Sequence, residues 1–355
     1  MSIIFLLPLV ACLIAFVCGL LIIRNAHKWQ LIANPNHRSS HVRPTPSGGG
    51  LGVVLSGVLT GFCLVWYSNW NWVLGAVVLA VSCVLAGVGF MDDIKHIRAS
   101  YRLGVQLAVS AAILFSMGGM PEIERFTAAY SSRIFLYAFL LVVILWWINL
   151  YNFMDGIDGL AGSQAVFMLV SGATLLAWLN PAVTSHPMWM WMLCIAGATL
   201  GFLFLNWTPA KIFMGDVGSV YLALMILSLA LMSIRYQWIS VSMGLSVWVI
   251  LGAIFVVDAT VTLLVRMCKG QRWYEAHRSH VYQRLSRRLD GHGPATMLYV
   301  AVNVFWLLPL AAACILWPQW MLIWVGLAYL PLVSAAVALG AGQSDKIKKP
   351  LPTLL

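Results

Sequence analysis

Acidic residues are scarce in this chain, and most of them lie where an apolar stretch gives way to a polar one. There are 11 in 355 positions: Asp92 and Asp93 end one apolar run, Asp155 and Asp158 follow a second, and Asp216 follows a third. A carboxylate close to lipid is costly and is seldom kept without a task. Five carboxylates at the ends of apolar runs therefore predict a metal-dependent site at a membrane surface.

The segment N-L-Y-N-F-M-D-G-I-D-G-L carries the most specific local pattern. Asn149, Asn152 and Asp155 recur every three residues, so they share one face if a helix continues through them, and Gly156 and Gly159 are expected to break that helix. Amide and carboxylate oxygens suit a hard cation such as Mg²⁺, which takes one or two protein ligands and completes its shell with substrate phosphates. Polar capping of a helical hairpin is the structural alternative.

The two acids of the M-D-D segment, Asp92 and Asp93, are expected to have different roles. Asp92 and Asp93 point in different directions on a helix, so one could meet a metal or act as a base while the other orients a neighbour. Lys95, Arg98 and Arg102 follow on nearby turns and could bind diphosphate, for which arginine offers a bidentate fork. Alternatively, these charges form a cluster at a helix end and satisfy one another.

Two glycine-containing segments could approach an anion or a cation. Gly48, Gly49 and Gly50 would let backbone amides come close to a bulky anion, and M-G-D-V-G-S places Asp216 in a tight turn. The basic residues before the glycines that could meet phosphate are His37, Arg38, His41 and Arg43. A plain basic loop with a turn explains that first segment equally well.

Histidines late in the chain and one deep acid leave alternatives open. His277 and His280 are three apart and could reach the same anion, while Arg278 could clamp phosphate. Zinc is disfavoured because no cysteine or carboxylate has a suitable spacing. Asp258 lies within an apolar run, which makes it a functional candidate, but the favoured interpretation is structural: the acid is neutral or bonded to a neighbouring helix.

The composition indicates that these residues belong to an integral membrane protein. The chain is 61% hydrophobic and 9% charged, whereas a soluble domain averages about 25% charged residues. The apolar runs lack the alternation of barrel strands and fit helices across a hydrocarbon core of about 30 Å. We predict an all-α polytopic membrane protein with about 11 transmembrane helices. The expected spans are residues 3–23, 49–67, 72–90, 103–118, 134–152, 161–179, 188–206, 218–234, 239–264, 295–316 and 319–340.

Basic residues predict the orientation. Of the 21 Lys and Arg residues, 18 share a side with the clustered acids, and only Arg125, Arg133 and Arg235 lie on the other side. The positive-inside rule then places the N-terminus in the periplasm and the C-terminus in the cytoplasm. This bias also accounts for the net charge of +10 without a nucleic-acid partner. The expected cytoplasmic active-site loops are 24–48, 91–102, 153–160, 207–217 and 265–294.

We expect one polytopic domain over residues 1–342, followed by a basic cytoplasmic tail, 343–355, close to anionic lipid. The seven cysteines lie mostly inside apolar runs and are expected to act as small hydrophobes. The rival functional class is a secondary transporter that uses intramembrane acids. Such a protein tends to place its ionisable residues near the midplane, in broken helices of repeated halves.

Taken together, the segments resemble the polyprenyl-phosphate N-acetylhexosamine-1-phosphate transferases, the family of WecA and MraY. R-P-T-P-S-G-G-G, M-D-D, N-x-x-N-x-x-D-G-x-D-G-L, G-D-x-G-S and a histidine-bearing last large loop occur in that order over nearly the whole chain. H-V-R-P-T-P-S-G-G-G and A-H-R-S-H-V-Y-Q are most similar to the WbpL-type branch, which initiates O-antigen chains in Gram-negative bacteria.

The resemblance implies a reaction and its partners. An N-acetylhexosamine-1-phosphate, of the N-acetylglucosamine or 6-deoxy N-acetylfucosamine type, would pass from a UDP-sugar to undecaprenyl phosphate with release of UMP. This step would begin lipopolysaccharide O-antigen synthesis at the bacterial inner membrane. Direct in-line attack is favoured, and a covalent phospho-aspartate route stays open. Membrane lipids are expected partners, and a homodimer is compatible with the sequence.

The resemblance also implies residue roles. Asp216 matches the principal Mg²⁺ ligand and Asn152 a second one, with Mn²⁺ as an alternative ion. The implied catalytic residues are Asp92, Asp93, Asp155 and Asp158, with Asp92 activating the lipid phosphate. The implied substrate-binding residues are Arg43, Thr45, Lys95, Arg102, Asn149, His277, Arg278 and His280. The two histidines depart by one residue from the family's more usual H-x-H spacing.

Overall fold

The computed structural model describes residues 6–33, 44–67, 72–95, 97–118, 130–272 and 277–343, without the side chains of residues 72 and 130–133. Within these ranges, 11 helical segments are long and apolar enough to cross a membrane. The helices are α1 (Leu7–Asn25), α2 (Gly50–Tyr67), α3 (Trp72–Lys95), α4 (Ala99–Ser116), α6 (Tyr130–Phe153), α7 (Leu160–Leu179), α8 (Pro187–Asn206), α9 (Asp216–Arg235), α10 (Val241–Cys268), α12 (His292–Val302), α13 (Leu308–Leu316) and α14 (Met321–Ala338). An all-α polytopic fold with 11 candidate membrane spans is confirmed.

Several short elements complete the chain. A π-helical turn, η3 (Asn303–Leu307), joins α12 to α13 within one span. The 3₁₀ turn η2 (Pro181–Ser185) lies in the connection between α7 and α8, and the 3₁₀ turn η4 (Pro318–Trp320) begins the last candidate span. Helix α11 (Val281–Arg288) is short and polar. Strands β1 (Ile32–Ala33) and β2 (Thr45–Pro46) pair antiparallel.

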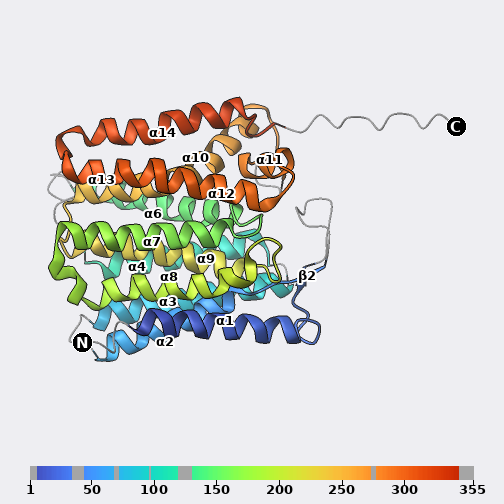
Figure 1. Cartoon of the computed structure of the whole chain (residues 1–355). Coiled ribbons are helices and arrows are strands. Elements are labelled where there is room, and N and C mark those ends of the chain that lie inside the picture. Colours follow the sequence, from blue (N-terminus) through green and yellow to red (C-terminus); the bar gives the residue numbers. More distant parts are fainter. Residues whose placement is uncertain are drawn as a thin grey trace.

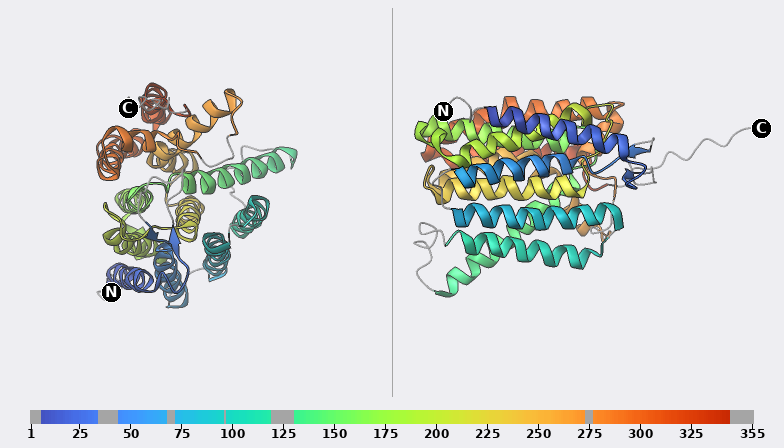
Figure 2. Two further views of the ribbon diagram at one scale, coloured as in Figure 1. Left: turned by 90° about the vertical axis from the view of Figure 1, so that its right-hand side faces the viewer. Right: turned by 90° about the horizontal axis from the view of Figure 1, so that it is seen from below.

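The spanning helices lie side by side in a bundle with α9 at its centre (Figures 1 and 2). The α9 span is 94% buried inside the protein, whereas that of α1 is 22% buried and that of η4 and α14 is 11% buried. The outer helices therefore leave apolar side chains for contact with lipid, and α9 packs against protein on nearly all sides. Strand β2 and helix α11 lie at the same end of the bundle (Figure 1).

Helix ends differ from the expected spans where polar residues continue a helix. Helix α3 runs to Lys95, so Asp92 and Asp93 lie in its last turn and do not follow it. Helix α6 ends at Phe153, so Asp155 lies beyond it, and the single helical face expected for Asn149, Asn152 and Asp155 does not form. Hydropathy marks where a segment leaves the lipid, whereas backbone hydrogen bonding decides where the helix stops.

Candidate active site

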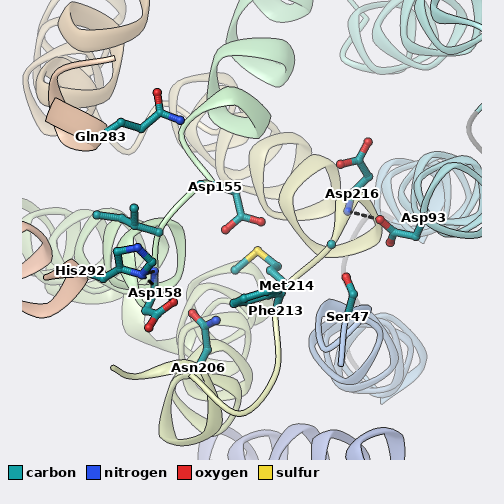
Figure 3. Close-up of a pocket in the computed structure, with 13 residues that line it drawn as sticks. Ser47, Asp93, Asp155, Asp158, Asn206, Phe213, Met214, Asp216, Gln283 and His292 are labelled. Carbon is teal, nitrogen blue, oxygen red and sulfur yellow. Dashed lines mark hydrogen bonds and ion pairs between the residues drawn. The ribbon is translucent and has the colours of Figure 1, made fainter. Parts of the chain in front are cut away.

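A pocket of about 310 Å³ (Figure 3) is lined by residues next to β2 and on α11, and so lies at that end of the bundle. Four carboxylates from three distant segments meet in it. Its lining residues are Ser47, Asp93, Asp155, Gly156, Ile157, Asp158, Asn206, Phe213, Met214, Gly215, Asp216, Gln283 and His292. The expected convergence of the acidic segments therefore occurs for Asp93, Asp155, Asp158 and Asp216.

Asp93 holds the beginning of α9 in place. Its two carboxylate oxygens accept hydrogen bonds from the backbone amides of Asp216, at 2.8 Å, and Val217, at 3.2 Å. These are two of the amides that a helix N-terminus leaves without an internal partner. Gly89 and Gly215 permit the approach, because a Cβ on Gly89 would lie 2.7 Å from the Asp216 carbonyl oxygen and one on Gly215 would lie 2.6 Å from an Asp93 oxygen.

Arg102 joins Asp92 to Asp216. Its guanidinium forms an ion pair with Asp92 and places Nη1 3.1 Å from Asp216 Oδ2, while the other Asp92 oxygen accepts the Ile97 amide at 2.6 Å. Asp92 does not line the pocket, and both of its oxygens have partners. The two adjacent acids thus have different contacts: Asp93 binds the N-terminus of α9, and Asp92 holds Arg102 beside Asp216.

Asp155 lies in the pocket between the end of α6 and the turn that follows it (Figure 3). Burial, together with the negative charge of Asp93, raises the pKa of the Asp155 carboxyl to about 7. A carboxyl with this pKa can hold or release a proton near neutral pH.

Asp158 is an anchored carboxylate. His292 Nδ1 lies 2.9 Å from one of its oxygens, and the Ala210 amide donates to the other at 3.1 Å. Burial acts to raise the pKa of Asp158, but the hydrogen bond and charge of His292 and the Ala210 amide outweigh it, so the pKa lies below its ordinary value. Asn206 ties the same turn to the segment before α9, because it accepts from the Gly159 amide and donates to the Ile212 carbonyl.

The triple-glycine segment packs against protein. The amides of Gly49 and Gly50 donate to the carbonyl oxygens of Phe213, at 2.8 Å, and Met214, at 2.9 Å. A Cβ on Gly50 would lie 2.3 Å from the Cα of Gly218. The expectation that this segment presents its amides to an anion is wrong for these two residues, since both amides already have acceptors. Their role is to dock the β2 end onto the segment that begins α9.

The expected metal ligands are neighbours. Asn152 lies next to the Asp216 carboxylate and donates to Ser219 Oγ at 3.2 Å. Among the described residues, no three His, Cys, Asp or Glu side chains form a ready metal cage. Mg²⁺ needs none, because it commonly takes one or two protein ligands, keeps waters and binds substrate phosphates. An all-oxygen donor set in a pocket with excess negative charge fits such an ion.

The expected substrate-binding residues are scattered. Arg102 reaches Asp216, whereas Lys95 is exposed at the end of α3 and Asn149 donates to Gln106 on α4 at 2.8 Å. Thr45 is buried in β2, and Arg43 lies outside the described residues with His37, Arg38 and His41.

The late histidines pack away from the pocket lining. The His277 and His280 rings stack with centroids 4.8 Å apart, and His280 Nδ1 lies 3.4 Å from Asp258. Arg278 is exposed, and its carbonyl accepts from Arg287. That both histidines reach one anion and that Arg278 clamps phosphate stay predictions.

The buried acid Asp258, in α10, binds the N-terminal amides of α11. It is 2% exposed and accepts the amides of Val281, at 2.8 Å, and Tyr282, at 3.0 Å, together with the Tyr299 hydroxyl at 2.6 Å. The favoured interpretation of Asp258 as bonded to a neighbouring element is confirmed.

Four polar pocket residues were not singled out from the sequence: Ser47, Asn206, Gln283 and His292. His292 follows a turn at the first position of a spanning helix, and this position was the one available signal for it. The others enter the pocket only through contacts between distant segments.

The fold and the site together define a polytopic membrane protein with a carboxylate-lined pocket at one end of its bundle. Residues 75–234 match the family model for glycosyl transferase family 4. The chain is similar to the phospho-N-acetylmuramoyl-pentapeptide-transferase of Mycobacteroides abscessus, with 30% identity over 273 residues, covering 65% of this chain and 72% of that protein. The protein of the same name from Mycobacterium bovis BCG Pasteur is 28% identical over 270 residues, with the same two coverages.

The chain belongs to glycosyl transferase family 4, the family of the polyprenyl-phosphate sugar-1-phosphate transferases. Family membership supports transferase activity at a membrane with polyprenyl phosphate and UDP-sugar substrates. The expected family is confirmed, and the WbpL-type branch stays a prediction.

Proposed function

We propose that this chain transfers an N-acetylhexosamine-1-phosphate from a UDP-sugar to undecaprenyl phosphate, releases UMP and so initiates O-antigen synthesis. The observation that carries the proposal is the meeting of four carboxylates, brought from distant segments, in one pocket at an end of the bundle. A pocket at a membrane surface suits a reaction between a water-soluble nucleotide sugar and a lipid phosphate. The similarity of two loop segments to the WbpL-type branch supports the O-antigen assignment.

The chemistry is phosphoryl transfer between two anions, which depends chiefly on positioning and electrostatics. An oxygen of the lipid phosphate forms a bond to the donor's β-phosphorus. The bond from that phosphorus to the bridging oxygen breaks, and the oxygen leaves with UMP. Asp155, whose pKa is about 7, is suited to accept a proton from the lipid phosphate. In this proposal Asp155 takes the role first expected of Asp92, because both Asp92 oxygens have partners.

Asp216 and Asn152 would hold Mg²⁺ or Mn²⁺, which would supply positive charge against the diphosphate. Asp93 fixes Asp216 by binding the amides at the start of α9. Asp92 keeps Arg102 beside Asp216, where its guanidinium can turn to a phosphate oxygen. Asp158 and His292 form the opposite wall (Figure 3).

We place the pocket at the cytoplasmic face of the bacterial inner membrane, with the N-terminus in the periplasm. The support is the bias of 18 of 21 Lys and Arg residues toward the side of the clustered acids. UDP-sugars are charged and water-soluble, so this side gives them access to the pocket. Residues 1–342 act as one transferase domain in this proposal.

The test is UMP release by purified chain with undecaprenyl phosphate and a panel of UDP-N-acetylhexosamines, with Mg²⁺ and with a chelator. Metal-dependent release with N-acetylglucosamine or a 6-deoxy relative as donor is expected. Absence of UMP with every donor, from protein shown to be folded, would contradict the proposal.

A second candidate is transfer of phospho-N-acetylmuramoyl-pentapeptide, which the names of the similar mycobacterial proteins favour. Including UDP-N-acetylmuramoyl-pentapeptide in the panel separates the two. A transporter is not favoured, because the deep acid Asp258 is saturated by protein hydrogen bonds and the remaining acids of the site gather at one end of the bundle.

A further inference from the structure

A glutamine on α11 presents a directed hydrogen-bond donor to the pocket. Gln283 is 6% exposed and lines the pocket, where its side chain reaches from α11 toward Asp155 (Figure 3). Its Oε1 accepts a hydrogen bond from the His280 backbone amide at 3.3 Å. A backbone N–H can only donate, so the oxygen of the side-chain amide must face His280. The orientation of the amide is therefore fixed, and Nε2 occupies the other position.

The Nε2 group has unused donors. Within the described residues, no carbonyl or side chain accepts a hydrogen bond from it, while the rest of the Gln283 side chain is buried. Nε2 is not one of the fully buried polar atoms that lack a partner among the described residues, so this donor is open to the pocket, where water or a ligand can accept from it. Because Gln283 borders the pocket, a ligand there can supply the acceptor.

The support of α11 keeps this donor in place. Asp258 binds the amides of Val281 and Tyr282, and the Tyr282 hydroxyl donates to the Phe153 carbonyl at the end of α6 at 3.0 Å. On the opposite side, Arg284 donates to the Leu339 carbonyl at 2.9 Å. Helix α11 is thus attached to α10, α6 and α14, and a fixed donor can discriminate between ligands because it cannot turn to follow a wrong one.

We propose that Gln283 determines the specificity for the sugar, by donating from Nε2 to the carbonyl oxygen of the donor's acetamido group. The inference rests on the proposed function and names the substrate group that this residue reads. A neutral amide donor suits a neutral carbonyl acceptor, and Nε2 faces the pocket while the oxygen of the same amide is held by the protein. A sugar with a hydroxyl in place of the acetamido group would leave Nε2 without its acceptor.

Two substitutions test this assignment in the full chain. Gln283→Glu keeps an acceptor for the His280 amide and removes the donor, while Gln283→Met removes both without adding charge. Arg287→Gln, on the exposed face of the same helix, is the matched control. For each variant, UMP release is measured with a UDP-N-acetylhexosamine and with the UDP-hexose that lacks the acetamido group, and inhibition by UMP is measured in parallel.

The native chain should prefer the acetamido donor, and both Gln283 variants should lose about tenfold or more in kcat/KM for it. For Gln283→Met, kcat/KM for the plain hexose donor and the inhibition constant for UMP should stay within about twofold of native values, whereas the added charge of Gln283→Glu should weaken both donors and UMP, with the larger loss for the acetamido donor. In the Met variant, equal losses for both donors, a weaker UMP affinity or an unchanged preference would each overturn the assignment. Inactivity of the native chain with every donor would instead count against the proposed function.

Discussion

At the scale of single residues, the pocket has more negative charge than its described cations offset. Asp93, Asp155, Asp158 and Asp216 line it, and nearby cations pair with two of them: His292 with Asp158 and Arg102 with Asp216. A bound cation would relieve this excess, and Asp216 is the carboxylate at the start of the central helix. We therefore expect the charge of Asp216 to contribute to ligand affinity and not to the stability of the fold.

We predict that Asp216→Ala loses at least about a thousandfold in kcat/KM for UMP release while its thermal unfolding temperature stays at or above that of the native chain. Removing a crowded carboxylate leaves Asp93 still bonded to the backbone amides of α9, which do not depend on the side chain at 216. Asp290→Asn, an exposed acid outside the pocket, is the control. Native-like turnover by Asp216→Ala would remove Asp216 from the metal site.

Asp155 predicts a dependence of stability on pH. Its pKa rises from 3.8 to about 7 on folding, so its favourable contribution is complete below pH 3.8 and is lost as the pH rises through 7. Asp155→Asn removes this loss. The variant should gain stability relative to the native chain between pH 5 and pH 8 by about 1–2 kcal/mol, less than the full shift allows because the pocket admits water.

Thermal unfolding in detergent at pH 5 and pH 8 measures this difference. Asp158→Asn is the opposing control, because the pKa of Asp158 is lowered and its carboxylate contributes stability above pH 3.8 that is lost only in more acidic solution. That variant should be less stable than the native chain at both pH values. A constant gap between Asp155→Asn and the native chain across this range would show that Asp155 does not titrate near neutral pH.

At the scale of elements, the N-terminal amides of two helices donate hydrogen bonds to carboxylates from other helices. Asp93 of α3 accepts the first amides of α9, and Asp258 of α10 accepts those of α11. A helix N-terminus carries free amides and partial positive charge, so an external carboxylate both satisfies and locates it. In this way α9 delivers Asp216 and α11 delivers Gln283 to one pocket.

The docking of α11 depends on a glycine in the turn between α6 and α7 that carries Asp155 and Asp158, here called the acid turn. A Cβ on Gly156 would lie 2.0 Å from the Tyr282 hydroxyl oxygen. Gly156→Ala should therefore push α11 away, destabilise the chain by about 1–3 kcal/mol and slow UMP release at least about tenfold. Thermal unfolding and turnover measure the two effects.

Adding Tyr282→Phe to Gly156→Ala removes the closest clashing atom and should recover part of both losses. Gly104→Ala in α4 is the control, because a Cβ there meets no atom within 4 Å. If Gly156→Ala behaved like Gly104→Ala, the close approach of α11 to the acid turn would be contradicted.

At the scale of the whole molecule, the 11 candidate spans of the described residues are an odd number, which predicts that the first and the last span lead to opposite sides of the membrane. The segment around Lys211 precedes α9 at the pocket end, and Ser185 lies in η2, one membrane span away along α8. If the pocket faces the cytoplasm, these two exposed residues lie on opposite sides of the membrane.

Single cysteines at these positions test the orientation in a chain whose seven native cysteines are replaced. We predict that a membrane-impermeant maleimide labels Ser185→Cys in cells with a permeable outer membrane and an intact inner membrane. Lys211→Cys should be labelled only after the inner membrane is opened. The reverse pattern would invert the proposed topology, and each variant's UMP release confirms that the labelled protein is native.

The sequence alone was sufficient for the helical membrane fold, the number of candidate spans and the family. Long apolar runs are a local property, because roughly 20 residues cross the hydrocarbon core whatever their neighbours are. The motifs around Asp92, Asp155 and Asp216 are likewise short stretches of chain. Their shared position at span ends predicted that they meet, and Asp93, Asp155, Asp158 and Asp216 do line one pocket.

Only the tertiary structure decided which polar group serves which partner. Asp93 is 123 residues from the amide of Asp216, and Asp158 is separated from His292 by 134 residues. The position of Asp155, and not Asp92, in the pocket lining and the packing role of Gly49 and Gly50 follow from such contacts. A hydrogen bond depends on distances of a few tenths of an ångström between separate helices, and these are set by how the whole bundle packs.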